Sequence, residues 1–142
     1  VKKLTNTNPQ QSEYNWLTCE LVDWLDYDGV KHQGLLYKPE DFDPNKKYPM
    51  MVYFYRLHSD DLHKHISPRA SSSTINAAFY ASNGYLVFMP DVYFKVGHPG
   101  KSAFNSIVSG VMSLGKEMSY IDMKKLALPI SILALLISIG SF

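Results

Sequence analysis

The sequence contains a single cysteine, almost no net charge and no pattern of a secretion signal. Cys19 alone excludes a framework of internal disulfide bonds, because each bridge needs two cysteines. The net charge is +1, so no strong electrostatic field draws the chain toward nucleic acid. The chain begins at Val1 without a charged segment followed by an apolar one, and a start without methionine predicts a processed chain or a fragment.

Long apolar runs are also missing, with one exception at the end of the chain. Residues 126–142 carry no charge, and they follow two lysines. A membrane-spanning helix needs about twenty apolar residues, and this stretch is shorter and contains Pro129, Ser131 and Gly140. We therefore expect no membrane partner, although a non-catalytic module anchored through this stretch stays an alternative.

The rest of the chain alternates between patterns typical of strands and of helices. Asp28-Gly29 between two β-prone runs indicates an antiparallel hairpin. The expected elements after it are strands at residues 50–55 and 85–90, helices at about 74–82 and 101–118, and a short strand beginning at residue 123. Strands that alternate with helices predict an α/β fold with a mainly parallel sheet covered on both faces.

The two expected helices carry recognisable signals. The first has a Ser/Thr cap at its start and Asn83-Gly84 as its stop. The second is amphipathic. Its apolar face is expected to consist of Phe104, Ile107, Val108, Val111 and Met112.

Two candidate sites have simpler interpretations. GHPGKS, residues 97–102, lies between a strand and a helix, as a phosphate-binding loop does, but Gly97 and Gly100 are too close for that motif. A turn that enters a helix explains it better. Cys19 stands alone in a predicted strand, which indicates a small buried residue rather than a nucleophile.

The segment HSDDLHKH gathers five potential metal ligands in eight residues. Imidazole and carboxylate groups bind Zn²⁺ and similar ions. The five are His58, Asp60, Asp61, His63 and His65. Their spacing matches no zinc motif, so a solvated loop whose histidines titrate near neutral pH is the simpler interpretation. A metal-binding module remains an alternative function.

Three stretches resemble the catalytic domain of the prolyl oligopeptidase family of serine peptidases. Residues 20–55 resemble its start, with D-G, then GLLYKP, then FDPNKKYP before an apolar strand. Residues 81–110, beginning ASNGYLVFMPD, resemble the next segment, and YIDMKKLAL at 120–128 resembles the lead into the nucleophile strand. The resemblance runs from about Glu20 to Leu128 and is closest to bacterial dipeptidyl- and acylaminoacyl-peptidase-like members.

The resemblance implies an α/β-hydrolase fold with a Ser-Asp-His triad, normally preceded by a β-propeller. In this family a tyrosine after the first parallel strand donates its hydroxyl to the oxyanion, and Tyr55 stands at that position. Spacing alone favours neither of two interpretations of Tyr53 and Tyr55: a donor to the oxyanion, or tyrosines that pack in the sheet with satisfied hydroxyls. The family often has glycines or a glutamate next, whereas this chain has Arg56-Leu57-His58.

The chain departs from the family after Leu128. The family continues into G-x-S-x-G-G, the turn that presents the nucleophilic serine, but Pro129 follows here and no G-x-S-x-G occurs in the chain. The fold class expected is an incomplete α/β-hydrolase fold, truncated before the nucleophile elbow. We expect residues 1–15 to be a polar connector from a missing propeller, 16–128 the N-terminal part of the peptidase domain, and 129–142 an apolar tail outside the family pattern.

The predicted function follows from the resemblance. It is that of a fragment of a serine-type peptidase that hydrolyses peptide bonds in oligopeptides, of the dipeptidyl or oligopeptidase class. The fragment is expected to be inactive alone, since the triad is absent. The partner of the intact parent would be a peptide substrate, with no cofactor, metal or nucleic acid. Because later strands of the sheet would be missing, an exposed apolar edge predicts a marginally stable or aggregation-prone chain.

Overall fold

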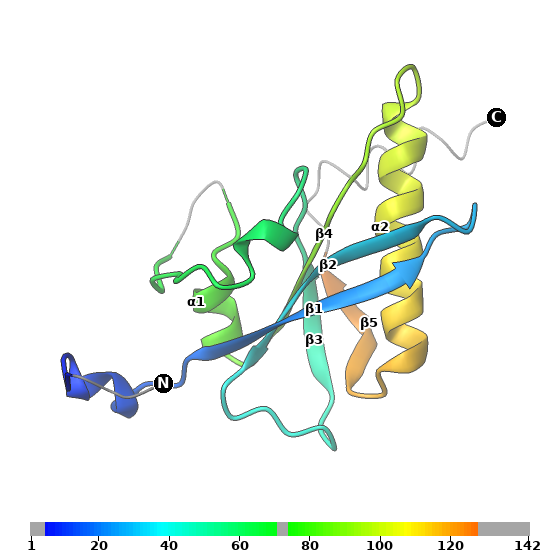
Figure 1. The fold of residues 1–142 in the computed structure, drawn as a ribbon. Coiled ribbons are helices and arrows are strands. Elements are labelled where there is room, and N and C mark those ends of the chain that lie inside the picture. The colour runs from blue at the N-terminus through cyan, green and yellow to red at the C-terminus, as the bar shows by residue number, and fades with distance from the viewer. Residues whose placement is uncertain (1–4, 71–73, 128–142) are drawn as a thin grey trace.

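The computed structural model describes residues 5–70 and 74–127, which form one mixed sheet with a helix on each face (Figure 1). The strand order is β1-β2-β4-β3-β5. The strands are β1 Leu17–Leu25, β2 Lys31–Pro39, β3 Tyr48–Val52, β4 Leu86–Pro90 and β5 Ile121–Ala127. The helices are α1 Ala77–Ser82 and α2 Pro99–Glu117, with the short 3₁₀ helices η1 Pro9–Glu13 and η2 Ser59–Asp61.

The predicted hairpin is confirmed as β1 and β2, paired antiparallel along their whole length. Its turn is closed by the Asp26 carboxylate, which accepts hydrogen bonds of 2.9 Å from the backbone N–H groups of Asp28 and Val30. Gly29 has φ of +78°, a conformation that side chains with a Cβ rarely adopt. The hairpin then joins the sheet through an antiparallel pairing of β2 with β4, which the sequence did not predict.

The parallel part of the sheet consists of β4, β3 and β5. The expected strand at residues 50–55 runs from Tyr48 to Val52 instead. The Tyr53 N–H still donates to the Phe88 carbonyl at 2.9 Å. The next bond of a parallel ladder would need an N–H at residue 90, and Pro90 has none. The strand therefore ends early, and residues 54 and 55 leave the sheet.

Helix α1 covers one face of the sheet and packs on residues of β2 and β4. This cluster contains Leu35, Tyr37, Ala77, Ala81, Val87 and Met89. The helix begins at Ala77 rather than near residue 74, because Asn76 is the cap: its side-chain oxygen accepts from the Phe79 N–H at 2.9 Å. Asn caps helices at least as well as Ser or Thr.

Helix α2 covers the opposite face and packs on Trp24 and Phe88, whose rings meet edge to face at 5.4 Å. The expected apolar face of this helix is wrong at Met112, which is 55% exposed. Small residues lie against Trp24 instead. A Cβ on Gly110 would come within 2.8 Å of the Trp24 ring, and the Trp24 indole N–H donates to the Ser106 carbonyl and to Ser109 Oγ at 3.1 and 3.0 Å.

The ends of the expected domain division are only partly within the structure. Residues 5–15 contain η1 and have no buried side chain. The expected apolar tail, residues 129–142, lies outside the described residues. In residues 5–70 and 74–127, no helix has the length and apolar character needed to cross a membrane.

Candidate functional site

Tyr55 lies just beyond the carboxyl end of β3, where the chain has left the sheet. Its side chain is 79% exposed, so it is not packed in the sheet. Within the described residues, its hydroxyl has no hydrogen-bond partner. Tyr53, two residues earlier, instead packs in the α1 cluster and places its ring 5.8 Å from that of His58. Of the two tyrosines, Tyr55 is therefore the more exposed at the carboxyl edge of the sheet, whereas Tyr53 is partly buried.

The loop that carries Tyr55 is held by backbone bonds to β4 and the residues after it. The Tyr53 N–H donates to Phe88, and the Val92 N–H donates to the Arg56 carbonyl at 2.6 Å. Tyr55 lies between these two bonds. The backbone around an exposed side chain is thus fixed on both sides.

Asp91, the first residue after β4, is fully buried and holds the continuation of the same loop. Its Oδ1 accepts from the backbone N–H groups of His58 at 2.5 Å and Ser59 at 3.0 Å. Its Oδ2 accepts from Ser59 Oγ at 2.6 Å. Gln33 on β2 donates from Nε2 to Ser59 Oγ at 2.9 Å. The backbone carbonyl of Gln33 accepts from the Asp91 N–H, also at 2.9 Å.

His58 lies half-buried in this loop. Burial lowers its pKa below the ordinary value of 6.5, although the Asp91 and Asp61 charges act in the opposite direction. The imidazole is therefore neutral at neutral pH. Its Nε2 is buried and has no partner among the described residues.

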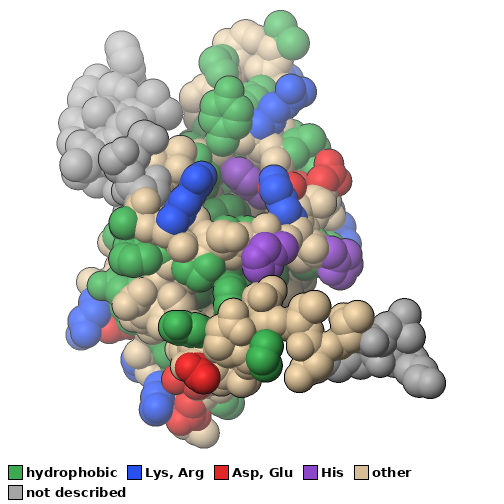
Figure 2. All heavy atoms as spheres, turned by 90° about the vertical axis from the view of Figure 1, so that its left-hand side faces the viewer, with side chains coloured by type: hydrophobic (Ala, Val, Ile, Leu, Met, Phe, Trp, Pro, Cys, Tyr) green, Lys and Arg blue, Asp and Glu red, His purple; other side chains and the backbone are tan. Residues whose placement is uncertain are grey.

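The five potential metal ligands of the histidine loop do not converge. In the part of the chain that the structure describes, no group of three or more His, Cys, Asp or Glu side chains could hold a metal ion. His63 and His65 are exposed, and Asp61 pairs with Lys64 at 3.2 Å. Figure 2 shows the histidine side chains of this face as separate groups near its middle, with basic side chains beside them. The metal-binding alternative gains no support from this arrangement.

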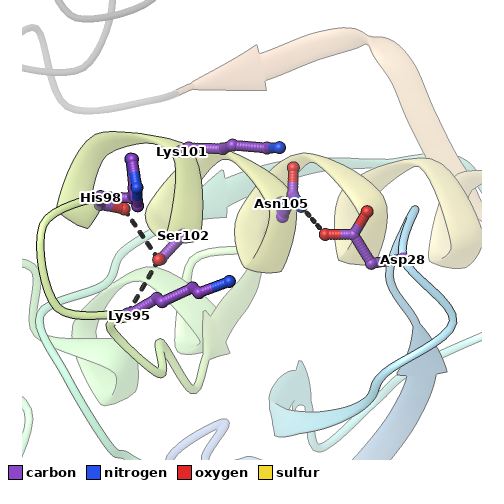
Figure 3. A pocket seen from close by; sticks show the side chains of 6 residues that line it. All are labelled: Asp28, Lys95, His98, Lys101, Ser102 and Asn105. Carbon is purple, nitrogen blue, oxygen red and sulfur yellow. Dashed lines mark hydrogen bonds between the residues drawn. The ribbon is translucent and has the colours of Figure 1, made fainter.

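GHPGKS forms a turn that enters α2, as the simpler interpretation predicted. Gly97 has φ of +82° and Pro99 is the first helical residue. The Ser102 hydroxyl is engaged within the loop: it accepts from the Lys95 N–H at 2.9 Å and donates to the His98 carbonyl at 2.8 Å (Figure 3). A pocket of about 180 Å³ lies beside it. The residues show no loop of successive N–H groups around a phosphate.

Cys19 is partly buried on β1 and interacts with Tyr37. Burial raises the pKa of the Cys19 thiol to about 11, so the thiol is protonated at neutral pH. Only the thiolate is an effective nucleophile. The prediction that Cys19 is a packing residue agrees with these properties.

The sequence prediction missed Asp91. A polar residue directly after a buried strand was the available signal, because ligand-binding groups of parallel sheets collect at the carboxyl ends of the strands. The partners of Asp91 are more than thirty residues away in the sequence. No local pattern indicates such contacts.

Sequence comparison finds dipeptidyl-peptidases. The chain is 31% identical over 98 residues to dipeptidyl-peptidase 5 of Aspergillus oryzae, which covers 64% of this chain and 12% of that protein. It is 25% identical over 135 residues to a candidate dipeptidyl-peptidase 5 of Aspergillus terreus, covering 86% of this chain and 18% of the relative. The chain thus spans less than a fifth of the length of these relatives. No family model matches.

Structure comparison finds solved structures that share this fold, peptidases and an esterase among them. A candidate dipeptidyl aminopeptidase IV of Bacteroides ovatus aligns with 88% of this chain and 19% of its own, at a TM-score of 0.60 and 25% identity. A post-proline cleaving enzyme of Rickettsia typhi aligns with 90% of this chain and 18% of its own, at 0.57 and 16% identity. The second likeness shows the fold alone. Together with the sequence relatives and the mixed sheet, these findings show that the chain resembles the prolyl oligopeptidase family of serine peptidases and is structurally similar to part of its α/β-hydrolase domain.

Proposed function

We propose that this chain supplies part of the hydrolase domain of a peptidase that cleaves peptide bonds in oligopeptides, and that Tyr55 is an oxyanion donor. The observation that carries the proposal is the position of Tyr55: beyond the carboxyl end of β3, 79% exposed, on a loop fixed on both sides. Ligand sites of open α/β sheets lie at this end of the strands. The names of the relatives, dipeptidyl-peptidases and a post-proline cleaving enzyme, support a peptide substrate.

The chemistry asked of Tyr55 is the stabilisation of negative charge. When a serine attacks a peptide carbonyl, the carbonyl oxygen becomes an oxyanion, and a placed O–H donor stabilises it more than it stabilises the neutral carbonyl. A hydroxyl without an internal acceptor is free to make that bond. Removal of one such donor typically lowers kcat by about 10² to 10³.

The remaining catalytic groups come from outside these 142 residues. No G-x-S-x-G is present to supply the serine and the backbone N–H that follows it. The aspartate and histidine follow the serine in the chain order of this fold. We infer that these residues do not hydrolyse peptide bonds alone, and that residues 1–15 connect the hydrolase domain to a preceding β-propeller.

A hybrid enzyme tests this proposal. Residues 16–127 replace the corresponding part of the Bacteroides ovatus protein, and a second hybrid receives only residues 53–61, which leaves the host's own strand in the position of β3. We expect Tyr55→Phe to lower kcat/KM for dipeptidyl p-nitroanilides by about 10² to 10³. Tyr53→Phe is the matched control, with expected activity within about threefold of the parent hybrid, because its ring packs against the α1 cluster and the oxyanion bond is proposed for Tyr55.

The isolated chain provides the complementary measurement. We expect no p-nitroanilide hydrolysis and no labelling by a fluorophosphonate, which reacts with activated serines. A labelled serine in the isolated chain would overturn the inferred inactivity. Unchanged kcat/KM in the Tyr55→Phe hybrid would overturn the role of Tyr55.

A further inference from the structure

Asp91 has the properties of a group that holds the Tyr55 loop in place. Its side chain is 0% exposed, and a buried carboxylate is costly unless donors surround it. Three donors from two consecutive residues, His58 and Ser59, converge on it. Carboxylates make stronger hydrogen bonds than neutral acceptors do.

The negative charge of Asp91 is stabilised by hydrogen bonds from the loop rather than by a neighbouring cation. The ion pairs of the described residues do not include Asp91. Tyr93 is the other nearby group: burial and the Asp91 charge raise the pKa of Tyr93, so its phenol stays protonated. The backbone N–H groups of His58 and Ser59 are therefore the main groups that stabilise the buried negative charge. Breaking their hydrogen bonds would leave that charge without these donors, which keeps the loop in place.

The same contacts constrain Tyr55. The chain from residue 53 to residue 59 is fixed at Tyr53, at the Arg56 carbonyl and at the two residues on Asp91. Residue 91 also sits directly before Val92, whose N–H holds Arg56. Movement of Asp91 would thus release the loop at two places on the carboxyl side of Tyr55.

We propose that Asp91 is a positioning residue that fixes the loop after β3 and thereby the hydroxyl of Tyr55. The proposal rests on the proposed function for the role of Tyr55, but the fixing of the loop can be measured without turnover. An asparagine has nearly the same shape, yet its one acceptor oxygen cannot serve both carboxylate positions, and its NH₂ group would face a donor.

The test measures amide hydrogen exchange in the 142-residue chain and in the longer hybrid, so that aggregation of the isolated chain does not remove the readout. Asp91→Asn should speed exchange at the His58 and Ser59 amides by about tenfold or more, since their acceptor loses its charge and hydrogen bonds to a neutral acceptor are weaker. Asp61→Asn is the matched control, a carboxylate of the same loop whose side chain forms an ion pair with Lys64 instead of accepting from the His58 and Ser59 amides. It should leave both rates unchanged.

Fluorotyrosine at position 55, read by fluorine NMR, reports on the tyrosine itself, and fluorotyrosine at position 120 is the reference. Asp91→Asn should shift or broaden the signal of Tyr55 and not that of Tyr120, whereas general destabilisation would change both. In the hybrid, Asp91→Asn should lower kcat more than it changes KM, and should add nothing when Tyr55→Phe is already present.

The outcomes separate the two proposals. Unchanged exchange at residues 58 and 59, or equal changes at Tyr55 and Tyr120, would overturn the positioning role of Asp91. Full activity of the Tyr55→Phe hybrid together with a released loop in Asp91→Asn would overturn the proposed function alone. Additive losses from the two substitutions would show that Asp91 does not act through Tyr55.

Discussion

The two faces of the sheet are covered in different ways. On one face lies α2, nineteen residues long, which meets Trp24 and Phe88 through apolar and small side chains. On the other lies α1, six residues long, beside an irregular loop that is held by polar contacts to Asp91 and Gln33. Regular packing stabilises the first face, while a few hydrogen bonds decide the geometry of the second. The loop that follows Tyr55 lies with the second face.

This difference explains which substitutions should unfold the chain and which should act locally. Contacts on the α2 face are numerous and shared, so one deletion weakens the whole sheet. The loop after β3 depends on bonds that can open without unfolding of the sheet. The predictions below test this division, beginning with the largest effect.

Phe88→Ala should unfold or nearly unfold the domain. Phe88 is 0% exposed, and its ring packs against Trp24 and beside Gly110. Loss of a buried phenylalanine typically costs about 3–5 kcal/mol, a large part of the stability of a small domain. Urea unfolding followed by circular dichroism measures it. Val87→Ala, on the opposite face of the same strand, is the control and should cost less; an equal cost would contradict the division between the faces.

Ser59→Ala should open the loop while the sheet stays folded. It removes the Ser59 Oγ donor to Asp91 and leaves Gln33 Nε2 without its acceptor. Bonds to charged groups contribute about 1.5–3 kcal/mol. Amide exchange should therefore rise at residues 58 and 59, with little change in β2 and β4. A uniform rise over the whole sheet would show that the loop and the core unfold as one unit.

Acid should destabilise the chain partly through His58. Its folded pKa lies below the ordinary 6.5 because of burial, so the unfolded state takes up a proton first as the pH falls. The contribution of the neutral His58 to the free energy of unfolding is fully present above about pH 6.5. It is lost as the pH falls from there through the folded pKa of His58. His58→Gln should reduce the fall in Tm between pH 7 and pH 5. An unchanged slope would mean that His58 does not titrate with folding.

Much of the fold was predictable because it depends on local patterns. The Asp28-Gly29 turn and the apolar runs of β3 and β4 are such patterns, and the structure confirms them. The residue at which β3 ends was not predictable from local patterns, since it depends on the missing N–H of Pro90 in the neighbouring strand β4. The buried face of α2 deviated at Met112 because Trp24, distant in the sequence, requires small partners.

The candidate site was predictable only in part. The position of Tyr55 after the first parallel strand came from resemblance, and the structure adds that its side chain is exposed and its loop is fixed. Asp91 was missed, since burial of a carboxylate is a tertiary property. The potential metal ligands His58, His63 and His65 are close in sequence. Their side chains do not converge on one point in the structure, because neighbouring residues in a loop point in different directions.

The most direct test of the central claim is the affinity of the hybrid enzyme for a peptidyl boronate, whose tetrahedral adduct imitates the oxyanion intermediate. We expect Tyr55→Phe to weaken boronate binding by about 10²-fold and to leave the affinity for a non-covalent product dipeptide unchanged, because the donor acts on the tetrahedral state. Equal loss of both affinities, or no loss of either, would contradict the assignment of Tyr55 as the oxyanion donor.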